Sequence, residues 1–478
     1  MPEPAFAVVG HPNKGKSSLV ATLARSRRIA ISPEPGTTTA AHRYPLRVGD
    51  RTLYTLIDTP GFQSPRAVLD YLQQHEAGAA SRPATVARFV AEHQGTDQFH
   101  DECELLGPLV DPHNPAAILY VVDGAKPYGP EYDAEMEVLR WTGRPSLAVI
   151  NPIAAGNQAK YADQWRDALG QFFKVVRVLD ALHAPFDQQI ELLRAFAQLE
   201  ESWRPNLEEA IAVLREDRRQ KRHDAAQAIA ELIAAAVTLR EQTEIDRDEQ
   251  PRPHVEKLRE RYRGKLRALE REARAEVERI YQHEGLDRHE ADVRVLDDDL
   301  FSKQTWRLFG LKRRDLLAVG AVSGAVVGGM ADAALLGSSF LAGTAIGAVA
   351  GGALAYFGSD KLADVKIRVL GQLGRQHLQI GPTKNVQFPF VLLARALHHH
   401  DLIARRTHAQ RDSLTIDSPE SSPEIATEAG QLNPLGDADK RRLAKLFQRL
   451  PKTEAGEVAR AELVDELADE VERLLEAD

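Results

Sequence analysis

Glycine, lysine and serine residues near the N-terminus have the spacing needed to hold phosphate groups. Residues 10–17 read GHPNKGKS, which is the pattern G-x-x-x-x-G-K-S. The apolar run AFAVV precedes it at residues 5–9, and SLVATL follows at residues 18–23. We therefore expect a strand, a loop and a helix in succession, with loop N–H groups directed at the phosphates beside a helix N-terminus. The candidate nucleotide-binding residues of this loop are Gly10, Asn13, Lys14, Gly15, Lys16, Ser17 and Ser18.

Two side chains of this loop and two later segments would supply the chemistry of phosphoryl transfer. Lys16 is expected to reach the β- and γ-phosphates, and the Ser17 hydroxyl to bind Mg²⁺. The threonines of PGTTT at residues 35–39 could complete the magnesium shell. A strand at residues 53–57 ends in DTPG, where Asp58 would hold Mg²⁺ through water and the Gly61 N–H would meet the γ-phosphate. This order of signals predicts a magnesium-dependent nucleoside triphosphatase.

The same segments resemble the Era/TrmE class of translation-related P-loop GTPases over about residues 5–200. The resemblance is carried by GxPNxGKS at residues 10–17, PGTT at residues 35–38 and DTPGF at residues 58–62. It implies GTP binding and hydrolysis with magnesium as the metal cofactor. The chain as a whole also resembles a group of bacterial GTPases whose C-terminal half is a helical domain of unknown function.

The resemblance assigns roles to individual residues. Thr38 corresponds to the switch I threonine, so the candidate catalytic residues are Lys16, Thr38 and Gly61, and the candidate magnesium ligands are Ser17, Thr38 and Asp58. Phe62 stands where many GTPases carry a water-orienting glutamine, so hydrolysis cannot depend on that side chain. In some relatives the asparagine that matches Asn13 helps to bind K⁺, which makes potassium stimulation a hypothesis.

The base-reading motif departs from the pattern of these GTPases. They carry N-K-x-D after the strand that corresponds to residues 146–150, whereas this chain has Asn151-Pro152-Ile153-Ala154. A site that loses a hydrogen-bonding partner for its base loses most of its discrimination. Ala181 falls where relatives have a serine–alanine loop and could offer its backbone N–H to the base. We therefore expect Asn151 and Ala181 to contact the nucleotide, with GTP favoured over ATP but less selectively than in the relatives.

Apolar runs and helical segments alternate after the phosphate loop. The runs at residues 117–123 and 146–150 flank a polar helical segment, which predicts a mostly parallel sheet with crossover helices. An insertion of 55 residues, Phe62 to Ala116, lies close to the DTPG motif and contains a helical stretch at Ala84–Glu92. Its position suits a segment that senses the nucleotide or binds an effector.

Composition limits the other classes of function. The formal net charge of −9 argues against broad, non-specific binding of nucleic acid, and we find no clear nucleic-acid site. A single cysteine, Cys103, excludes an internal disulfide framework and fits a reducing compartment. The N-terminal residues MPEP lack the features of a signal peptide, so a cytoplasmic location is expected.

The C-terminal half is rich in helix-forming residues. Apolar residues recur on one helical face within residues 206–247 and again at Leu258, Tyr262, Leu266 and onward to Ile280. Such stripes predict long helices at about 206–247 and 254–283 that pack against partners. Two amphipathic helices are predicted at Ala438–Leu450 and Glu457–Glu476, and these could support self-association or effector binding.

A glycine-rich apolar segment, Leu316–Phe357, is the most distinctive feature of this half. Its single charge is Asp332, and glycines recur every four residues in each half of the segment: Gly320, Gly324 and Gly328, then Gly343, Gly347 and Gly351. This pattern predicts a glycine-zipper helical hairpin that contacts membrane lipid, which would associate the protein with the inner membrane. The alternative interpretation is a closely packed soluble core.

These observations predict an α/β P-loop GTPase domain followed by a mainly α-helical C-terminal half. The expected function is a GTP-binding and GTP-hydrolysing switch whose nucleotide state controls that half. Two alternatives stay open: a soluble GTPase that acts on ribosomes or RNA, and a nucleotide-binding scaffold with little turnover. The predicted divisions are 1–204 (GTPase domain, with the insertion at about 62–116), 205–300 (long charged helices), 301–360 (hairpin), 361–412 (helical), 413–436 (linker) and 437–478 (C-terminal helices).

Overall fold

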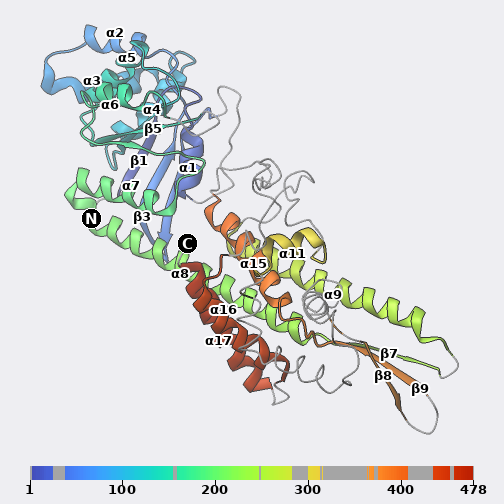
Figure 1. Cartoon of the computed structure of the whole chain (residues 1–478). Coiled ribbons are helices and arrows are strands. Elements are labelled where there is room, and N and C mark those ends of the chain that lie inside the picture. The colour runs from blue at the N-terminus through green and yellow to red at the C-terminus, as the bar shows by residue number, and fades with distance from the viewer. Residues whose placement is uncertain are drawn as a thin grey trace. The chain divides into compact units, whose positions relative to one another are not determined.

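The computed structural model places two compact units, Met1–Asp217 with Arg405–Arg411 and Arg218–Ala404 with Asp412–Asp478 (Figure 1). The glycine-rich segment Leu316–Phe357 and most of the predicted linker lie outside the described residues. The structure describes residues 3–24, 38–153, 159–246, 249–282, 300–312, 315, 363, 365–370, 375–406, 434–452 and 457–476.

The first unit is built on a six-stranded sheet with the order β2-β3-β1-β4-β5-β6. Five neighbouring strands run parallel, and β2 pairs antiparallel with β3 at one edge. The predicted mostly parallel sheet is therefore confirmed. The strands are β1 (Ala5–Val9), β2 (His42–Val48), β3 (Arg51–Asp58), β4 (Ala117–Asp123), β5 (Ser146–Asn151) and β6 (Val176–Val178).

Helices cover both faces of this sheet, which explains why β1 and β4 are buried along their whole length and apolar except for Asp123 at the end of β4. Phe6 and Val8 face a core shared with α1, α7 and the start of α8. The alternate residues Ala5, Ala7 and Val9 face a second core shared with the other helices of the unit. The helices are α1 (Lys16–Ala24), α2 (Pro65–Gln74), η1 (Ala79–Ser81), α3 (Arg82–His93), α4 (His100–Val110), α5 (Glu131–Trp141), α6 (Ala162–Leu169), α7 (Phe186–Leu199) and η2 (Glu201–Trp203).

The insertion between β3 and β4 folds as three packed helices rather than as a loop. Helices α2, α3 and α4 lie between Pro65 and Val110, and the stretch predicted as helical at Ala84–Glu92 lies within α3. Val68, Val86 and Leu105 anchor the three helices in the core that also contains Phe62. The segment is therefore an integral part of the first unit.

The second unit is largely helical, as predicted, but it also contains a small sheet. Helix α8 begins in the first unit and continues into this one, and its apolar stripe packs with that of α9 in one core. Leu258, Tyr262 and Leu266 on α9 are buried, in agreement with the predicted stripe. The helices are α8 (Arg204–Thr238), α9 (Pro251–Ile280), α11 (Lys303–Phe309), α15 (Phe388–Arg405), α16 (Asp437–Arg449), η6 (Leu450–Lys452) and α17 (Glu457–Glu476).

The three-stranded sheet corrects two sequence-based expectations. Strand β7 (Glu241–Ile245) lies where the helix at 206–247 was expected to continue, and β8 (Val365–Leu370) and β9 (Arg375–Ile380) lie in the region expected to be helical at 361–412. The strands pair antiparallel in the order β7-β9-β8. Because β7 pairs with residues more than 130 positions away, local periodicity could not reveal it.

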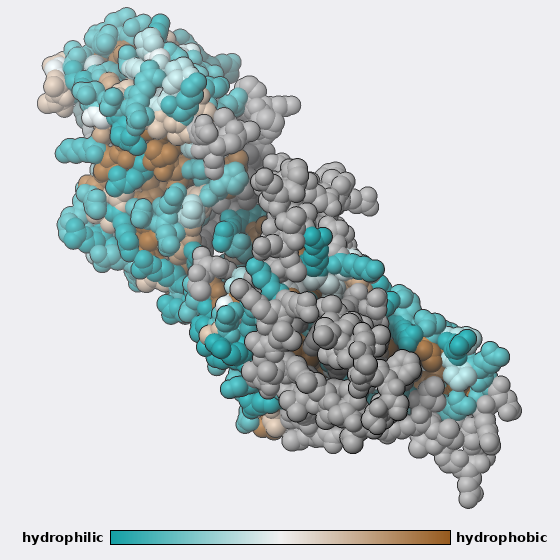
Figure 2. Space-filling view, viewed as in Figure 1, coloured by the Kyte–Doolittle hydropathy of each residue, from teal (hydrophilic) through white to brown (hydrophobic). Residues whose placement is uncertain are grey.

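On the face seen in Figure 2, the residues coloured by hydropathy are mostly hydrophilic, with a patch of hydrophobic residues on the first unit. Within the ranges that the structure describes, no helix has both the length and the apolar character needed to cross a bilayer.

Candidate nucleotide-binding site

The phosphate loop lies between β1 and α1, in the context predicted from the sequence. It follows Val9, the last residue of β1, and its Lys16 is the first residue of α1. Gly15 has a φ of 81°, and a Cβ placed there would lie 2.2 Å from Nδ2 of Asn151. Only glycine therefore fits at this position, since a side chain would be strained in the left-handed region and would also displace Asn151.

Lys16 is buried within the loop. Its side chain folds back, so that Nζ donates a hydrogen bond to the His11 carbonyl at 3.0 Å. Burial lowers the pKa of Lys16 to about 8, an effect that the nearby Asp58 carboxylate partly opposes. An ammonium group in such an environment gains strongly from a new anionic partner, because its charge is poorly solvated in the free protein.

Ser17, Thr38 and Asp58 come together from three separate segments. Oγ of Ser17 lies 3.3 Å from Oγ1 of Thr38, which in turn donates to Oδ2 of Asp58 at 3.4 Å. Oδ1 of Asp58 is buried and has no hydrogen-bond partner among the described residues. Burial also raises the pKa of Asp58, with Ser17, Lys16 and Thr38 opposing the shift. Two hydroxyls and a carboxylate with a free buried oxygen form a donor set that fits Mg²⁺.

Gly61 passes directly against the phosphate loop. A Cβ on Gly61 would lie 2.5 Å from the backbone nitrogen of Pro12, so only glycine allows this approach. The next residue, Phe62, donates its backbone N–H to the Gly10 carbonyl at 3.2 Å. The Phe62 side chain is fully buried in the core of α2–α4 and β1. It therefore points away from the place where a water-orienting glutamine would act.

Asn151 is held by the protein backbone on both sides of its amide. Nδ2 donates to the Lys14 carbonyl at 3.1 Å, and Oδ1 accepts from the Ala181 N–H at 3.0 Å. Thr22 of α1 bonds to the Ala181 carbonyl at 2.6 Å. Asn151 therefore links the phosphate loop to the loop after β6, which explains how the asparagine can remain where the lysine and aspartate of the motif are absent.

The same contacts bear on the predicted base contacts. The Ala181 N–H that was expected to face the base is buried and bonded to Asn151 in this structure. Ile153, two residues after Asn151, is 40% exposed, and its Cδ1 would lie 3.8 Å from a Cβ at Gly15. Ala154 lies outside the described residues. Contacts of Asn151 and Ala181 with a base stay predictions.

Comparisons with known proteins agree with this geometry. Residues 5–151 match the family described as "50S ribosome-binding GTPase". Residues 166–469, more than half of the chain, match the family described as "Domain of unknown function (DUF3482)". The chain belongs to the DUF3482 family. Its N-terminal part is a GTPase domain related to that of Der.

The relatives of this DUF3482 protein share only part of its length. GTPase Der of Burkholderia cenocepacia (strain HI2424) is 32% identical over 149 residues, which are 31% of this chain and 26% of that protein. GTPase Der of Burkholderia ambifaria (strain MC40-6) is 30% identical over the same lengths. The chain thus spans about a quarter of the length of these curated relatives.

Among solved structures, the chain is similar to a variant of Aquifex aeolicus Era bound to GDP.AlF4-. The two sequences are 16% identical, and the match covers 59% of this chain and 90% of that chain with a TM-score of 0.27. Era in complex with MgGDPNP and nucleotides 1506-1542 of 16S ribosomal RNA has the same identity and coverage, with a TM-score of 0.28.

The remaining loop residues of the DUF3482 protein differ in their surroundings. Asn13 is exposed with a φ of 58°, and Ser18 is half-buried. Lys14 is buried and lies 4.0 Å from the Asp123 carboxylate, with its ammonium 5.7 Å from the centre of the Tyr132 ring. The ammonium of Lys14 therefore faces the end of β4, and the contact of this residue with the nucleotide stays a prediction.

Sequence reasoning missed one buried group beneath the loop. Glu135 of α5 is fully buried, where Oε1 lies 2.7 Å from Nδ1 of His11 and Oε2 accepts from the Tyr120 hydroxyl at 2.8 Å. These contacts fix the first turn of the phosphate loop to α5 and β4. No motif connects the three residues, so the sequence carried no signal for the contact.

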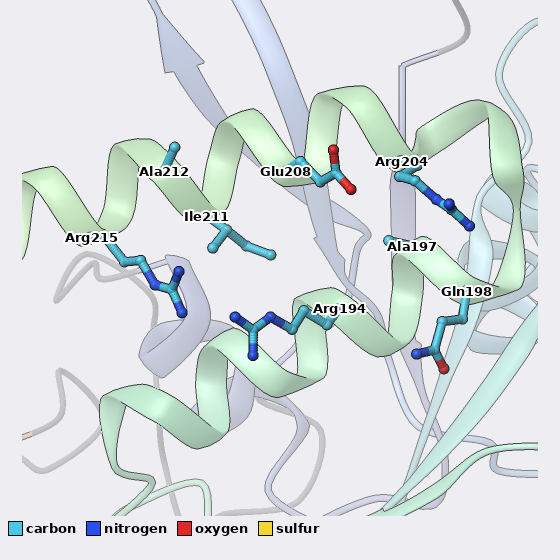
Figure 3. Close-up of a pocket in the computed structure, with 8 residues that line it drawn as sticks. All are labelled: Arg194, Ala197, Gln198, Arg204, Glu208, Ile211, Ala212 and Arg215. Carbon is cyan, nitrogen blue, oxygen red and sulfur yellow. The ribbon is translucent and has the colours of Figure 1, made fainter.

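A groove of about 490 Å³ lies between α7 and α8, and none of its lining residues belongs to the phosphate loop or to the segments around Thr38 and Gly61. Figure 3 shows Arg194 of α7 and Arg215 of α8 extending toward one another across it. Its lining combines these arginines with Glu208 and Ile211 and offers no arrangement of hydroxyls around a carboxylate. The candidate site therefore remains the loop at the end of β1.

Proposed function

We propose that this DUF3482 protein is a GTP-binding and GTP-hydrolysing switch that uses Mg²⁺. The observation that carries the proposal is the meeting of Ser17, Thr38 and Asp58 beside the buried ammonium of Lys16. These residues come from three segments that are far apart in the sequence. A cation site next to a phosphate loop has a clear use only when a phosphate chain is bound between them.

Catalysis in this proposal is electrostatic. Lys16 and the loop N–H groups would stabilise negative charge on the β- and γ-phosphates, and the Gly61 N–H would bond to the γ-phosphate. Ser17 and Thr38 would hold Mg²⁺, which would supply charge neutralisation for the phosphoryl group that is transferred. Residue 62 does not orient the attacking water, since the Phe62 side chain lies in the core. Potassium binding by Asn13 would add positive charge at the phosphates and stays a prediction.

Nucleotide binding tests this proposal directly. We expect the purified chain to bind GTP only when Mg²⁺ is present, as measured by titration calorimetry with EDTA as the control. ATP should compete with an affinity within about a hundredfold of that of GTP, because the aspartate that reads guanine is missing. A folded sample without magnesium-dependent affinity for either triphosphate would contradict the proposal. Phosphate release distinguishes the switch from a scaffold that binds without turnover.

For the C-terminal half, we propose contact with membrane lipid through Leu316–Phe357, under control of the nucleotide state. The proposal rests on sequence: the segment holds a single charge, Asp332, and basic residues flank it at Lys312, Arg313 and Arg314 and at Lys361 and Lys366. Helix α8, which begins in the unit with the nucleotide site and continues into the second unit, is one route by which the nucleotide could influence that half.

Co-sedimentation tests the lipid proposal. The full chain should sediment with liposomes of bacterial lipid, whereas a chain without Leu316–Phe357 should remain in the supernatant. Both chains are also sedimented with ribosomes, because the matching family is described as ribosome-binding. Sedimentation of both chains with ribosomes, and of neither with liposomes, would favour the alternative function on ribosomes or RNA.

A further inference from the structure

Helix α4 of the insertion contacts the backbone on both sides of the candidate magnesium site. Its N-terminal residues include His100, Glu102 and Glu104, none of which belongs to a nucleotide-binding motif. The switch I segment, defined here as residues 38–41, and the switch II segment, residues 58–64, both bond to these residues. One short stretch of helix therefore supports the two segments expected to respond to the γ-phosphate.

Glu102 supports switch II. Its side chain is only 3% exposed, and Oε1 accepts hydrogen bonds from the backbone N–H groups of Gln63 at 3.0 Å and Ser64 at 2.6 Å. These two N–H groups follow Gly61 and Phe62 and immediately precede α2. A carboxylate that accepts two backbone N–H bonds at a helix N-terminus makes strong, charge-assisted contacts. The chain after Gly61 is thereby held in place.

Glu104 and His100 support switch I. Oε2 of Glu104 accepts from the Ala41 N–H at 2.9 Å, and Nε2 of His100 donates to the Thr39 carbonyl at 3.2 Å. Both contacts lie within three residues of Thr38, whose hydroxyl joins Ser17 and Asp58. They therefore restrain the backbone that carries the candidate magnesium ligand.

The apolar face of α4 is anchored in the core. Cys103, Leu105, Leu106 and Leu109 are buried in the same cluster as Phe62. Because closely packed cores resist deformation, the helix can act as a fixed support for the two switch segments.

We propose that Glu102 and Glu104 are positioning residues that hold Gly61 and Thr38 in the arrangement that accepts a triphosphate. The inference rests on the proposed function. Thr38 and Gly61 act on the magnesium ion and the γ-phosphate, whereas the phosphate loop alone grips the β-phosphate that GDP also carries. Loss of the α4 contacts should therefore weaken triphosphate binding selectively. A purely structural helix cap would instead affect both nucleotides alike.

The test compares the affinities of GDPNP and GDP, each with Mg²⁺, across variants of the full chain. Glu102→Ala and Glu104→Ala should each raise the Kd of GDPNP about tenfold, the size expected for loss of a charge-assisted hydrogen bond. The Kd of GDP should remain within about twofold of the wild-type value, since the phosphate loop is unchanged. Glu102→Gln keeps an acceptor oxygen and should recover most of the GDPNP affinity.

Glu92→Ala is the matched control. Glu92 lies on α3 of the same insertion and bonds to the Tyr71 hydroxyl and to Arg88, so its contacts stay within the insertion. Its substitution should leave the GDPNP-to-GDP ratio at the wild-type value. Thermal unfolding of each variant shows whether it is folded, and Glu104→Ala carries the test if Glu102→Ala does not fold.

One result would overturn the inference: an unchanged ratio of the GDPNP and GDP affinities in folded Glu102→Ala and Glu104→Ala, whether both affinities are kept or both fall equally. If the proposed function itself were wrong, the wild-type chain would lack magnesium-dependent affinity for GDPNP. Normal wild-type binding with an unchanged ratio in the variants therefore contradicts only the role of α4.

Discussion

The substitution Lys16→Met is expected to abolish triphosphate hydrolysis and, at the same time, to stabilise the protein without nucleotide. Methionine keeps an apolar stem of similar length and removes the ammonium group. Hydrolysis should fall by at least about a hundredfold, because a principal positive charge at the transferred phosphoryl group is lost. Phosphate release by wild type and variant under saturating Mg²⁺–GTP measures this loss.

The gain in stability follows from the pKa of Lys16. Burial lowers this pKa from 10.5 to about 8. The charged form of Lys16 is therefore less favourable in the folded protein without nucleotide than in the unfolded chain. At neutral pH this difference costs about 3 kcal/mol of folding free energy, which methionine would not incur. The penalty is complete below pH 8 and fades as pH rises toward 10.5. The variant should therefore be more stable at pH 7, with an advantage that shrinks in alkaline buffer.

The pH dependence of nucleotide binding should reveal the same titration of Lys16. Bound phosphates favour the charged form of Lys16, so the free protein must take up a proton when it binds above pH 8. The wild-type affinity should fall about tenfold per pH unit once the pH exceeds that value. An affinity that stays constant between about pH 7 and pH 9.5 would contradict the buried, destabilised ammonium.

Lys14 supplies the contrast for this prediction. It is also buried, but its ammonium lies 4.0 Å from the Asp123 carboxylate. Removing one member of such a buried pair leaves the other charge poorly compensated, so Lys14→Met should lower stability. Opposite effects of the two substitutions on the unfolding midpoint would trace the difference to the environment of each charge. Destabilisation by both would mean that packing of the stems dominates.

The sequence predicted the parts of this molecule that local patterns determine. The apolar runs at β1, β4 and β5 and the GKS and DTPG motifs placed Lys16 and Ser17 in the loop and helix after β1, and Asp58 at the end of β3. Parallel neighbouring strands bring these segments together at one edge of the sheet. The amphipathic helices α9 and α17 were likewise evident from their periodicity.

What the sequence did not reveal depends on contacts between distant residues. Strand β7 forms because Glu241 pairs with Ile380, and its residues EQTEI alone resemble the end of a polar helix. The bonds of Asn151 to Lys14 and Ala181 and those of Glu102 to Gln63 and Ser64 involve backbone groups, which leave no mark on side-chain patterns. The pKa of Lys16 is a property of the folded loop and not of its motif.

A glutamine introduced at position 62 is expected to destabilise the first unit without increasing hydrolysis. Phe62 is fully buried, and loss of its ring from a packed core costs about 3 to 5 kcal/mol. The amide of Phe62→Gln would add the cost of burying polar atoms without partners, about 1 to 3 kcal/mol. Unfolding in urea measures the loss of stability. The unfolding transition of the first unit is the one whose midpoint moves to a higher urea concentration when GTP is added.

Phe62→Leu separates packing from chemistry at this position. Leucine is apolar and partly fills the cavity, so its effect on stability should be clearly smaller than that of glutamine. Neither variant should raise the rate of phosphate release per folded molecule, because the Phe62 backbone N–H is bonded to Gly10 and directs the side chain into the core. A glutamine variant that kept wild-type stability and hydrolysed GTP faster would show that the side chain can turn toward the γ-phosphate. In that case Phe62 would limit the rate of the wild-type protein, and the water would be oriented as in GTPases that carry glutamine there.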